Sequence, residues 1–209
     1  MCRRHFILAL AFFALFSTTF HAEDTWQKEA DLLAGLLQWH SGSVVAEIGA
    51  GDGQLTLQAA RRVGAPGKVF TTELEGAKLS HLHELAKKHS NISVVKAGEA
   101  DTNLPANCCD SIFMRLVYHH FTKPADIDSS LFRSLRPGGL LAVIDEEPAP
   151  GSSVPDGVPS NRVGHGIPIE VLKSELTTAG FEFVSSTTDW PSRDASHDMY
   201  RALFRKPKP

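Results

Sequence analysis

The chain has 209 residues, of which 42% are hydrophobic and 22% are charged, and its formal net charge is -3 with histidine neutral. This length is enough for one domain with a sizeable core, and the composition excludes a fibrous or disordered chain. The small negative charge gives no reason to expect binding to nucleic acid or to an anionic membrane.

The first 22 residues have the layout of a secretory signal, in which a short basic start precedes an apolar run, Phe6–Phe16. That run is shorter than the about 20 residues of a membrane-crossing helix. Phe20 stands where a cleavage site prefers a small residue. We expect residues 1–22 to be a signal peptide or a retained membrane anchor, and residues 23–209 to be the folded domain. The protein is then periplasmic, secreted or membrane-anchored, and a cytoplasmic location stays open.

The segment that begins at residue 44 predicts a strand, a glycine turn and a helix in succession. Val44–Ile48 is a short, largely β-branched apolar run, typical of a buried parallel strand. Gly49, Gly51 and Gly53 follow at alternate positions, and apolar residues recur with helical spacing from Leu55. Glycine admits positive φ and lets a ligand approach the main chain. The amides that open the helix would face that ligand.

Two classes of ligand use such a turn. A dinucleotide fingerprint would place glycine at position 54, where this chain has Gln54. Glu47, inside the strand end, would repel a pyrophosphate but suits a ligand with an ammonium group. The pattern Glu47-x-Gly49-x-Gly51-x-Gly53 resembles the first motif of the class I S-adenosylmethionine (SAM) methyltransferases. The resemblance implies that Glu47 receives the amino group of SAM. The turn residues that would hold its methionine end are Gly49, Ala50, Gly51 and Gly53.

A second predicted strand, Lys68–Glu73, ends in an acid. A carboxylate at this point lies above the sheet beside the glycine turn and can accept both hydroxyls of a ribose. We therefore predict that Glu73, with Leu74 next to it, binds the nucleoside part of SAM. The alternative is a solvated glutamate at a helix start.

A third predicted strand, Asn91–Val95, leads to the acidic segment Gly98–Asp101. In the methyltransferases a short acidic segment at this place receives the adenine. The resemblance implies this role for the Glu99 side chain and the Ala100 backbone. Asp101 could serve instead, and a plain acidic surface loop is the further alternative.

A fourth predicted strand, Asp110–Met114, is followed by Arg115, which we include in the cofactor site, and then by Tyr118, His119 and His120. Groups just past the carboxyl end of a parallel strand line the ligand crevice. The Val-Tyr-His-His-Phe run also resembles a segment of small predicted class I methyltransferases. We predict these three side chains as catalytic, with a histidine as the base that removes a proton from the acceptor. The alternative is that one histidine caps the next helix and the other packs on it.

Later segments complete an α/β domain. The turn Arg136–Gly139 is predicted to close a helix before a fifth strand, Leu140–Ile144, and the Pro-, Gly- and Ser-rich stretch Pro148–Gly166 is predicted as a lid or binding loop. Phe181–Thr188 and Met199–Arg205 read as an antiparallel pair. The predicted fold is Rossmann-like and doubly wound, with a mainly parallel seven-stranded sheet and an antiparallel last strand.

Taken together, these motifs imply a SAM-dependent enzyme that methylates a small-molecule acceptor. A SAM- or nucleoside-binding module without activity is the alternative, because an exported protein would lie apart from cytosolic SAM. Glu47 and Gln54 argue against an NAD-dependent oxidoreductase. Membrane contact is expected only if residues 1–22 are retained, and the sequence leaves the oligomeric state open.

No metal site is predicted from the sequence. The pair His81 and His83 does not share a helix face, because its spacing is two residues. The adjacent cysteines, Cys108 and Cys109, lack the spacing of metal ligands and are read as small apolar loop residues.

Overall fold

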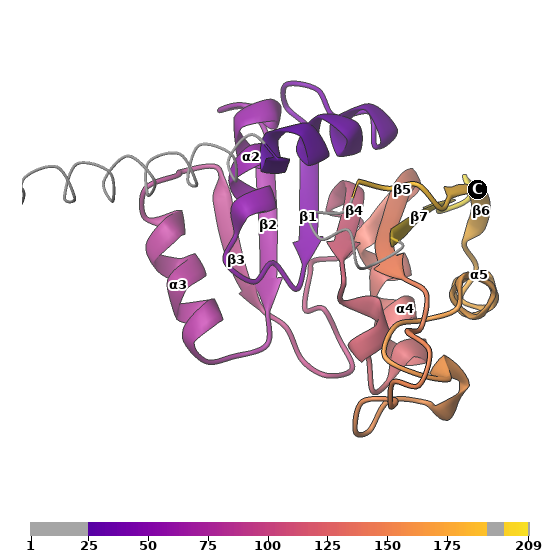
Figure 1. Ribbon diagram of the computed structural model, residues 1–209. Coiled ribbons are helices and arrows are strands. Elements are labelled where there is room, and N and C mark those ends of the chain that lie inside the picture. Colours follow the sequence, from indigo (N-terminus) through magenta and orange to yellow (C-terminus); the bar gives the residue numbers. More distant parts are fainter. Residues whose placement is uncertain (1–24, 192–198, 209) are drawn as a thin grey trace, which may run out of the picture.

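The structure is a computed structural model that describes residues 25–191 and 199–208. Within these ranges, seven strands form one sheet with the order β3-β2-β1-β4-β5-β7-β6 (Figure 1). The strands are β1 (Val44–Ile48), β2 (Lys68–Glu73), β3 (Ile92–Lys96), β4 (Cys109–Arg115), β5 (Leu135–Glu146), β6 (Glu182–Thr187) and β7 (Met199–Arg205). The predicted signal or anchor, residues 1–22, lies outside the described residues.

Helices connect the strands as the apolar periodicity predicts. The described helices are residues 25–36, α2 (Gln54–Val63), α3 (Ala77–Ala86), α4 (Pro124–Ser134) and α5 (Ile169–Thr178), with short 3₁₀ turns η1 (Tyr118–His120) and η2 (Ser160–Arg162). In the part of the chain that the structure describes, none of the helices combines the length and the apolar character needed to cross a membrane.

The strand pairing confirms the predicted fold. β1 pairs in parallel with β2 and β4, and β4 pairs in parallel with β5. β7 is antiparallel to both β5 and β6, between which it lies. The result is a doubly wound, Rossmann-like sheet whose last strand is antiparallel.

The sheet separates two apolar cores, because successive side chains of a strand point to opposite faces. On one face, Ile112 and Leu141 pack with α4 and α5. On the other face, Val45 and Phe113 pack with the helix of residues 25–36, α2 and α3. Helices therefore cover both faces, which explains why β1 reads as a continuous apolar run.

One strand differs from the prediction. β5 begins at Leu135, so the residues Arg136–Gly139, predicted as a turn, belong to the strand. Leu135 pairs with Cys109 of β4, and the Lys206 amide donates to the Gly139 carbonyl at 2.9 Å. The β4 register shifts between Cys109 and Ser111, so residues 136–139 have no partner on β4, and Gly138 has a positive φ of 81°. The predicted turn is therefore present as a bulge within β5.

Strand order reverses between β1 and β4, and this fixes the place of a ligand site. β2 and β3 lie on one side of β1, and β4 and β5 lie on the other. In Figure 1 the arrowheads of β1 and β2 point to the same edge of the sheet. The crevice outside the carboxyl ends at such a reversal is where open α/β sheets bind their ligands.

We predict that Leu141→Ala lowers the free energy of unfolding by about 2–5 kcal/mol, because this central β5 side chain is fully buried and its removal leaves a cavity. Leu32→Ala is the matched control, since Leu32 is 45% exposed on the N-terminal helix, and it should cost less than about 0.5 kcal/mol. Urea titration measures both values. Equal effects of the two substitutions would contradict the assigned core.

Candidate functional site

A cavity of about 580 Å³ lies at the carboxyl ends of β1, β2 and β4. Its volume falls within the about 300–1,000 Å³ of small-molecule sites. The predicted site residues that line it are Glu47, Gly49, Ala50, Gly51, Glu73, Leu74, Glu99, Arg115 and His120. The predicted site residues outside its lining are Gly53, Ala100, Tyr118 and His119. The structure thus brings together most of the positions that the sequence singled out.

The three glycines of the turn all have positive φ, at 65°, 57° and 72°. A Cβ on Gly49 would lie 2.7 Å from the Val117 side chain, and one on Gly53 would lie 2.8 Å from Leu82. Packing therefore requires both of these glycines. A Cβ on Gly51 would meet only the Lys78 ammonium group, 4.0 Å away. The absence of a side chain at Gly51 therefore leaves room in the cavity next to the main chain.

The Glu73 carboxylate is tied directly to the glycine turn. It accepts a hydrogen bond from the Gly51 amide at 3.0 Å and another from the Leu74 amide at 3.1 Å. A carboxylate has about four lone-pair sites, so acceptor capacity remains for hydroxyl groups of a ligand. The predicted place of Glu73 beside the turn is the place observed.

Glu47 is a buried carboxyl group at the floor of the turn, 4% exposed. The Thr56 hydroxyl donates to it. Burial raises the pKa of Glu47 to about 8, against the lowering effect of the Thr56 contact, and nearby Glu29 and Glu73 raise it further. Among the described residues no ion pair of Glu47 is found, so a cation entering the cavity would meet an uncompensated carboxyl group.

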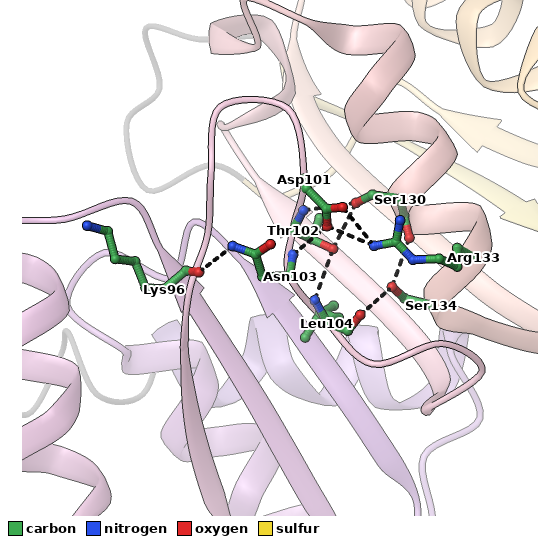
Figure 2. Close-up of polar contacts among 8 residues, drawn as sticks. All are labelled: Lys96, Asp101, Thr102, Asn103, Leu104, Ser130, Arg133 and Ser134. Carbon is green, nitrogen blue, oxygen red and sulfur yellow. Dashed lines mark hydrogen bonds and ion pairs between the residues drawn. The ribbon is translucent and has the colours of Figure 1, made fainter.

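The segment after β3 is held by α4 at several points (Figure 2). The Thr102 amide donates to Ser130 Oγ at 2.9 Å, and Asp101 forms an ion pair with Arg133 at 2.8 Å. Asp101 therefore faces α4, whereas Glu99 lines the cavity. Of the two acids left open by the sequence, Glu99 is the one placed to meet a ligand.

Arg115 connects the end of β4 to the N-terminal helix. Its Nε donates to Glu29 Oε1 at 2.8 Å, and the Trp190 indole donates to the same oxygen at 3.1 Å. Trp26, one helical turn before Glu29, lines the cavity together with Arg115. The sequence offered no signal for the long-range contact between Arg115 and Glu29.

Tyr118 belongs to a buried polar network behind the cavity. Its hydroxyl lies 2.9 Å from Asp128 Oδ2 and 3.0 Å from Glu175 Oε2. Arg162, fully buried, pairs with both oxygens of Glu175 at 2.7 and 3.0 Å. Burial raises the pKa of Asp128 to about 7. The catalytic role of Tyr118 stays a prediction, but its hydroxyl is occupied by these groups.

The two histidines of η1 have different surroundings. His119 is 1% exposed, and its Nδ1 lies 2.6 Å from Asp145 Oδ1. A carboxylate accepts hydrogen bonds, so Nδ1 of His119 is the donor in this contact and Nε2 points away from Asp145. His120 lines the cavity, and burial followed by the proximity of His119 and His165 lowers its pKa. The base role assigned to this pair stays a prediction.

We predict that Tyr118→Phe lowers the free energy of unfolding by about 1–3 kcal/mol, because two carboxyl groups lose a hydrogen-bonding hydroxyl. SAM affinity should be unchanged, since Tyr118 is outside the cavity lining. Denaturant titration and calorimetric SAM binding test both parts. Unchanged stability with lost turnover would instead support the catalytic role.

Comparisons with known proteins agree with this geometry. Residues 46–143 match a family model described as a methyltransferase domain. The ubiquinone/menaquinone biosynthesis C-methyltransferase UbiE of Proteus mirabilis is 30% identical over 104 residues, which are 48% of this chain and 41% of that protein. The chain thus spans about two fifths of the length of the curated relatives it matches.

Solved structures share the fold over most of the chain. A SAM-dependent methyltransferase from Aquifex aeolicus has a TM-score of 0.68 and 22% identity, with 85% of this chain and 89% of that chain covered. The [4+2]-cyclase SpnF has a TM-score of 0.70 and 17% identity, with coverage of 88% and 82%. At these identities the likeness concerns the fold alone.

The fold expected from the resemblance to the class I SAM-dependent methyltransferases is therefore confirmed. The chain has the fold of the class I methyltransferases, and its residues 46–143 match the model of a methyltransferase domain.

Proposed function

We propose that this protein transfers a methyl group from SAM to a small-molecule acceptor. The observation that carries the proposal is that Glu47, Glu73 and the glycine turn line one cavity at the strand-order reversal. The family match over residues 46–143 supports the reaction class.

The cavity residues suit the separate parts of SAM. Glu47 would receive the ammonium group of the methionine end, which supplies the positive charge that this buried carboxyl lacks. The space beside Gly51 would admit that end against the main chain. The spare lone pairs of Glu73 would accept the ribose hydroxyls.

The adenine would lie between the ends of β2 and β3. Leu74, 49% exposed at the cavity, offers an apolar surface for the ring. Glu99 offers an acceptor for its amino group, and the contacts of Thr102 with α4 hold that segment in place. These roles rest on the position of each side chain in one cavity.

SAM, when bound, supplies a methyl group on a positively charged sulfur. The role of the protein is to hold the acceptor in line behind the methyl carbon and to exclude water. Such positioning is worth up to about 7–11 kcal/mol of the barrier. His120 and Phe121, past the end of β4, line the cavity where an acceptor would meet the cofactor.

The size of the cavity and the reactions named for similar proteins both support a small organic acceptor. UbiE is named as a C-methyltransferase of quinone biosynthesis, and SpnF is named as a [4+2]-cyclase. The second name matters because one fold hosts different reactions. A direct assay must therefore separate methyl transfer from SAM binding without transfer.

The assay incubates the purified protein with methyl-labelled SAM and cell extract, then separates small molecules from macromolecules. Label in the small-molecule fraction is the expected result. Label in protein or nucleic acid would overturn the acceptor class. SAM binding without label in any fraction would favour the inactive binding module.

We predict that Gly51→Val weakens SAM binding by at least about 100-fold, equivalent to about 2.8 kcal/mol. The branched side chain would occupy cavity space beside the turn. Gly42→Val is the matched control, because Gly42 also has positive φ (93°) and open surroundings but lies before β1, away from the cavity. Calorimetry on both variants distinguishes a filled site from backbone strain. Equal loss of affinity in the two variants would refute the placement.

We predict that SAM affinity rises with pH between about pH 6 and 7.5, by at most about tenfold per unit. The Glu47 pKa is about 8 in the free protein, and an ammonium partner favours the ionised form, so binding must release this proton. Glu47→Gln should abolish the pH slope and weaken binding. A slope that persists in Glu47→Gln would assign the proton to another group.

The raised pKa of Glu47 also predicts that the stability of the free protein falls with pH, whereas SAM affinity rises. The folded carboxyl stays protonated up to about 8, whereas the unfolded one ionises near 4.5. The unfolded state therefore binds fewer protons across this interval, and the contribution of Glu47 to stability falls as pH rises through it. Without SAM, Glu47→Gln should be more stable than the wild type at pH 7.5.

A further inference from the structure

Three histidines meet beside the cavity, although one of them is far away in the sequence. One ring nitrogen from each of His119, His120 and His165 lies within 4.8 Å of the other two. The ring centroids are 4.0 Å apart for His119 and His120 and 4.7 Å apart for His119 and His165. The first two histidines come from η1, and the third comes from the long loop after β5.

His119 is oriented by a fully buried carboxylate. Asp145 accepts hydrogen bonds from the His119 ring at 2.6 Å and from the His119 backbone amide at 3.3 Å. It also accepts one from the Glu146 amide at 2.9 Å. Nδ1 of His119 is thus occupied, whereas Nε2 is buried and has no hydrogen-bond partner among the described residues. A buried ring nitrogen without a partner is a candidate ligand for an ion.

His165 is placed by the backbone of its loop. Its amide donates to Ser152 Oγ at 2.8 Å. It is flanked by Gly164, whose added Cβ would lie 2.7 Å from Ser152 Oγ, and by Gly166, whose added Cβ would lie 2.8 Å from the Glu146 carbonyl oxygen. These close approaches fix the loop against the end of β5. The His165 Nδ1 then lies 3.3 Å from Glu146 Oε1.

We infer that His119, His120 and His165 bind one divalent transition-metal ion at the edge of the SAM cavity. Two of the three imidazoles have a carboxylate on Nδ1, the arrangement that orients metal-binding histidines and raises their basicity. The Nε2 atoms of these two rings remain for the ion. This inference departs from the sequence-based expectation, which was that no metal site is present.

The donor set selects the class of metal. Neutral imidazoles suit zinc, copper, iron, nickel and cobalt, whereas calcium and magnesium prefer oxygen ligands. A tetrahedral zinc ion would hold its ligand nitrogens about 3.4 Å apart. The observed limit of 4.8 Å therefore requires a modest inward movement, which the partly exposed His120 and His165 can make through their side chains.

Three protein ligands leave a coordination position open, as in catalytic zinc sites. Because His120 lines the cavity, that position would face the acceptor. The ion would bind an oxygen, nitrogen or sulfur atom of the acceptor and lower its pKa. This part rests on the proposed methyltransferase function. Ligation through Nε2 would also exclude His119 as the general base.

The test titrates the full chain, stripped with a chelator, with ZnCl₂ by calorimetry and with CoCl₂ by visible absorption. We expect one tight site in the wild type, with the intense bands of tetrahedral cobalt. His165→Ala should abolish that site, and Asp145→Asn should weaken it by about 10–100-fold. His81→Ala is the matched control, because His81 is an exposed histidine outside the cluster.

Calorimetric SAM binding in the same preparations separates this inference from the proposed function. His165→Ala should bind SAM like the wild type, because His165 does not line the cavity. Absence of a one-to-one metal site, or an equal site in His165→Ala, would overturn the metal inference and leave the methyltransferase proposal standing. A metal site in a protein that binds no SAM would overturn the proposed function alone.

Discussion

The hydrogen bond from the Gly51 amide to the Glu73 carboxylate, 3.0 Å long, joins the turn after β1 to the end of β2. The Ala50 amide also donates to the Thr72 carbonyl at 2.9 Å, and the Gly49 amide donates to Thr72 Oγ1 at 3.3 Å. These three bonds together hold the turn that lines the cavity. The turn can take its path only with positive φ at three glycines. Two of them are demanded by packing, and Gly51 alone opens toward a ligand. The fold thus supplies a rigid site, and the substrate-facing residues are added around it.

Carboxylate groups at this edge of the sheet have two distinct tasks. Glu47 and Glu73 face the cavity, where their charge suits the ammonium and hydroxyl groups of SAM. Asp145 and Glu146 face imidazole rings instead. In the proposed account, Asp145 and Glu146 therefore orient the histidines. The cofactor end and the acceptor end of the site come from different strands of one sheet.

Local patterns predicted the elements, and long-range contacts account for what was missed. The bounds of β1, β2 and β7 agree with the predicted ranges because apolar runs mark all three strands, and glycines flank β1 and precede β2. The Pro-Gly-Gly signal before residue 140 predicted a turn, and the structure has a bulge there inside β5, between the residues that pair with Cys109 and Ser111. The position of Glu73 beside the turn could be predicted because the carboxyl ends of neighbouring parallel strands lie at the same edge of a sheet. His165 was not connected to His119, because their proximity depends on a loop path that no local signal encodes.

The most direct measurement is a crystal structure of the full chain with SAM or its demethylated product. The account predicts the amino group of the ligand within about 3.2 Å of the Glu47 carboxylate and the ribose hydroxyls within the same distance of Glu73. A nucleoside bound outside this cavity, or bound in it with neither carboxylate in contact, would contradict the central claim.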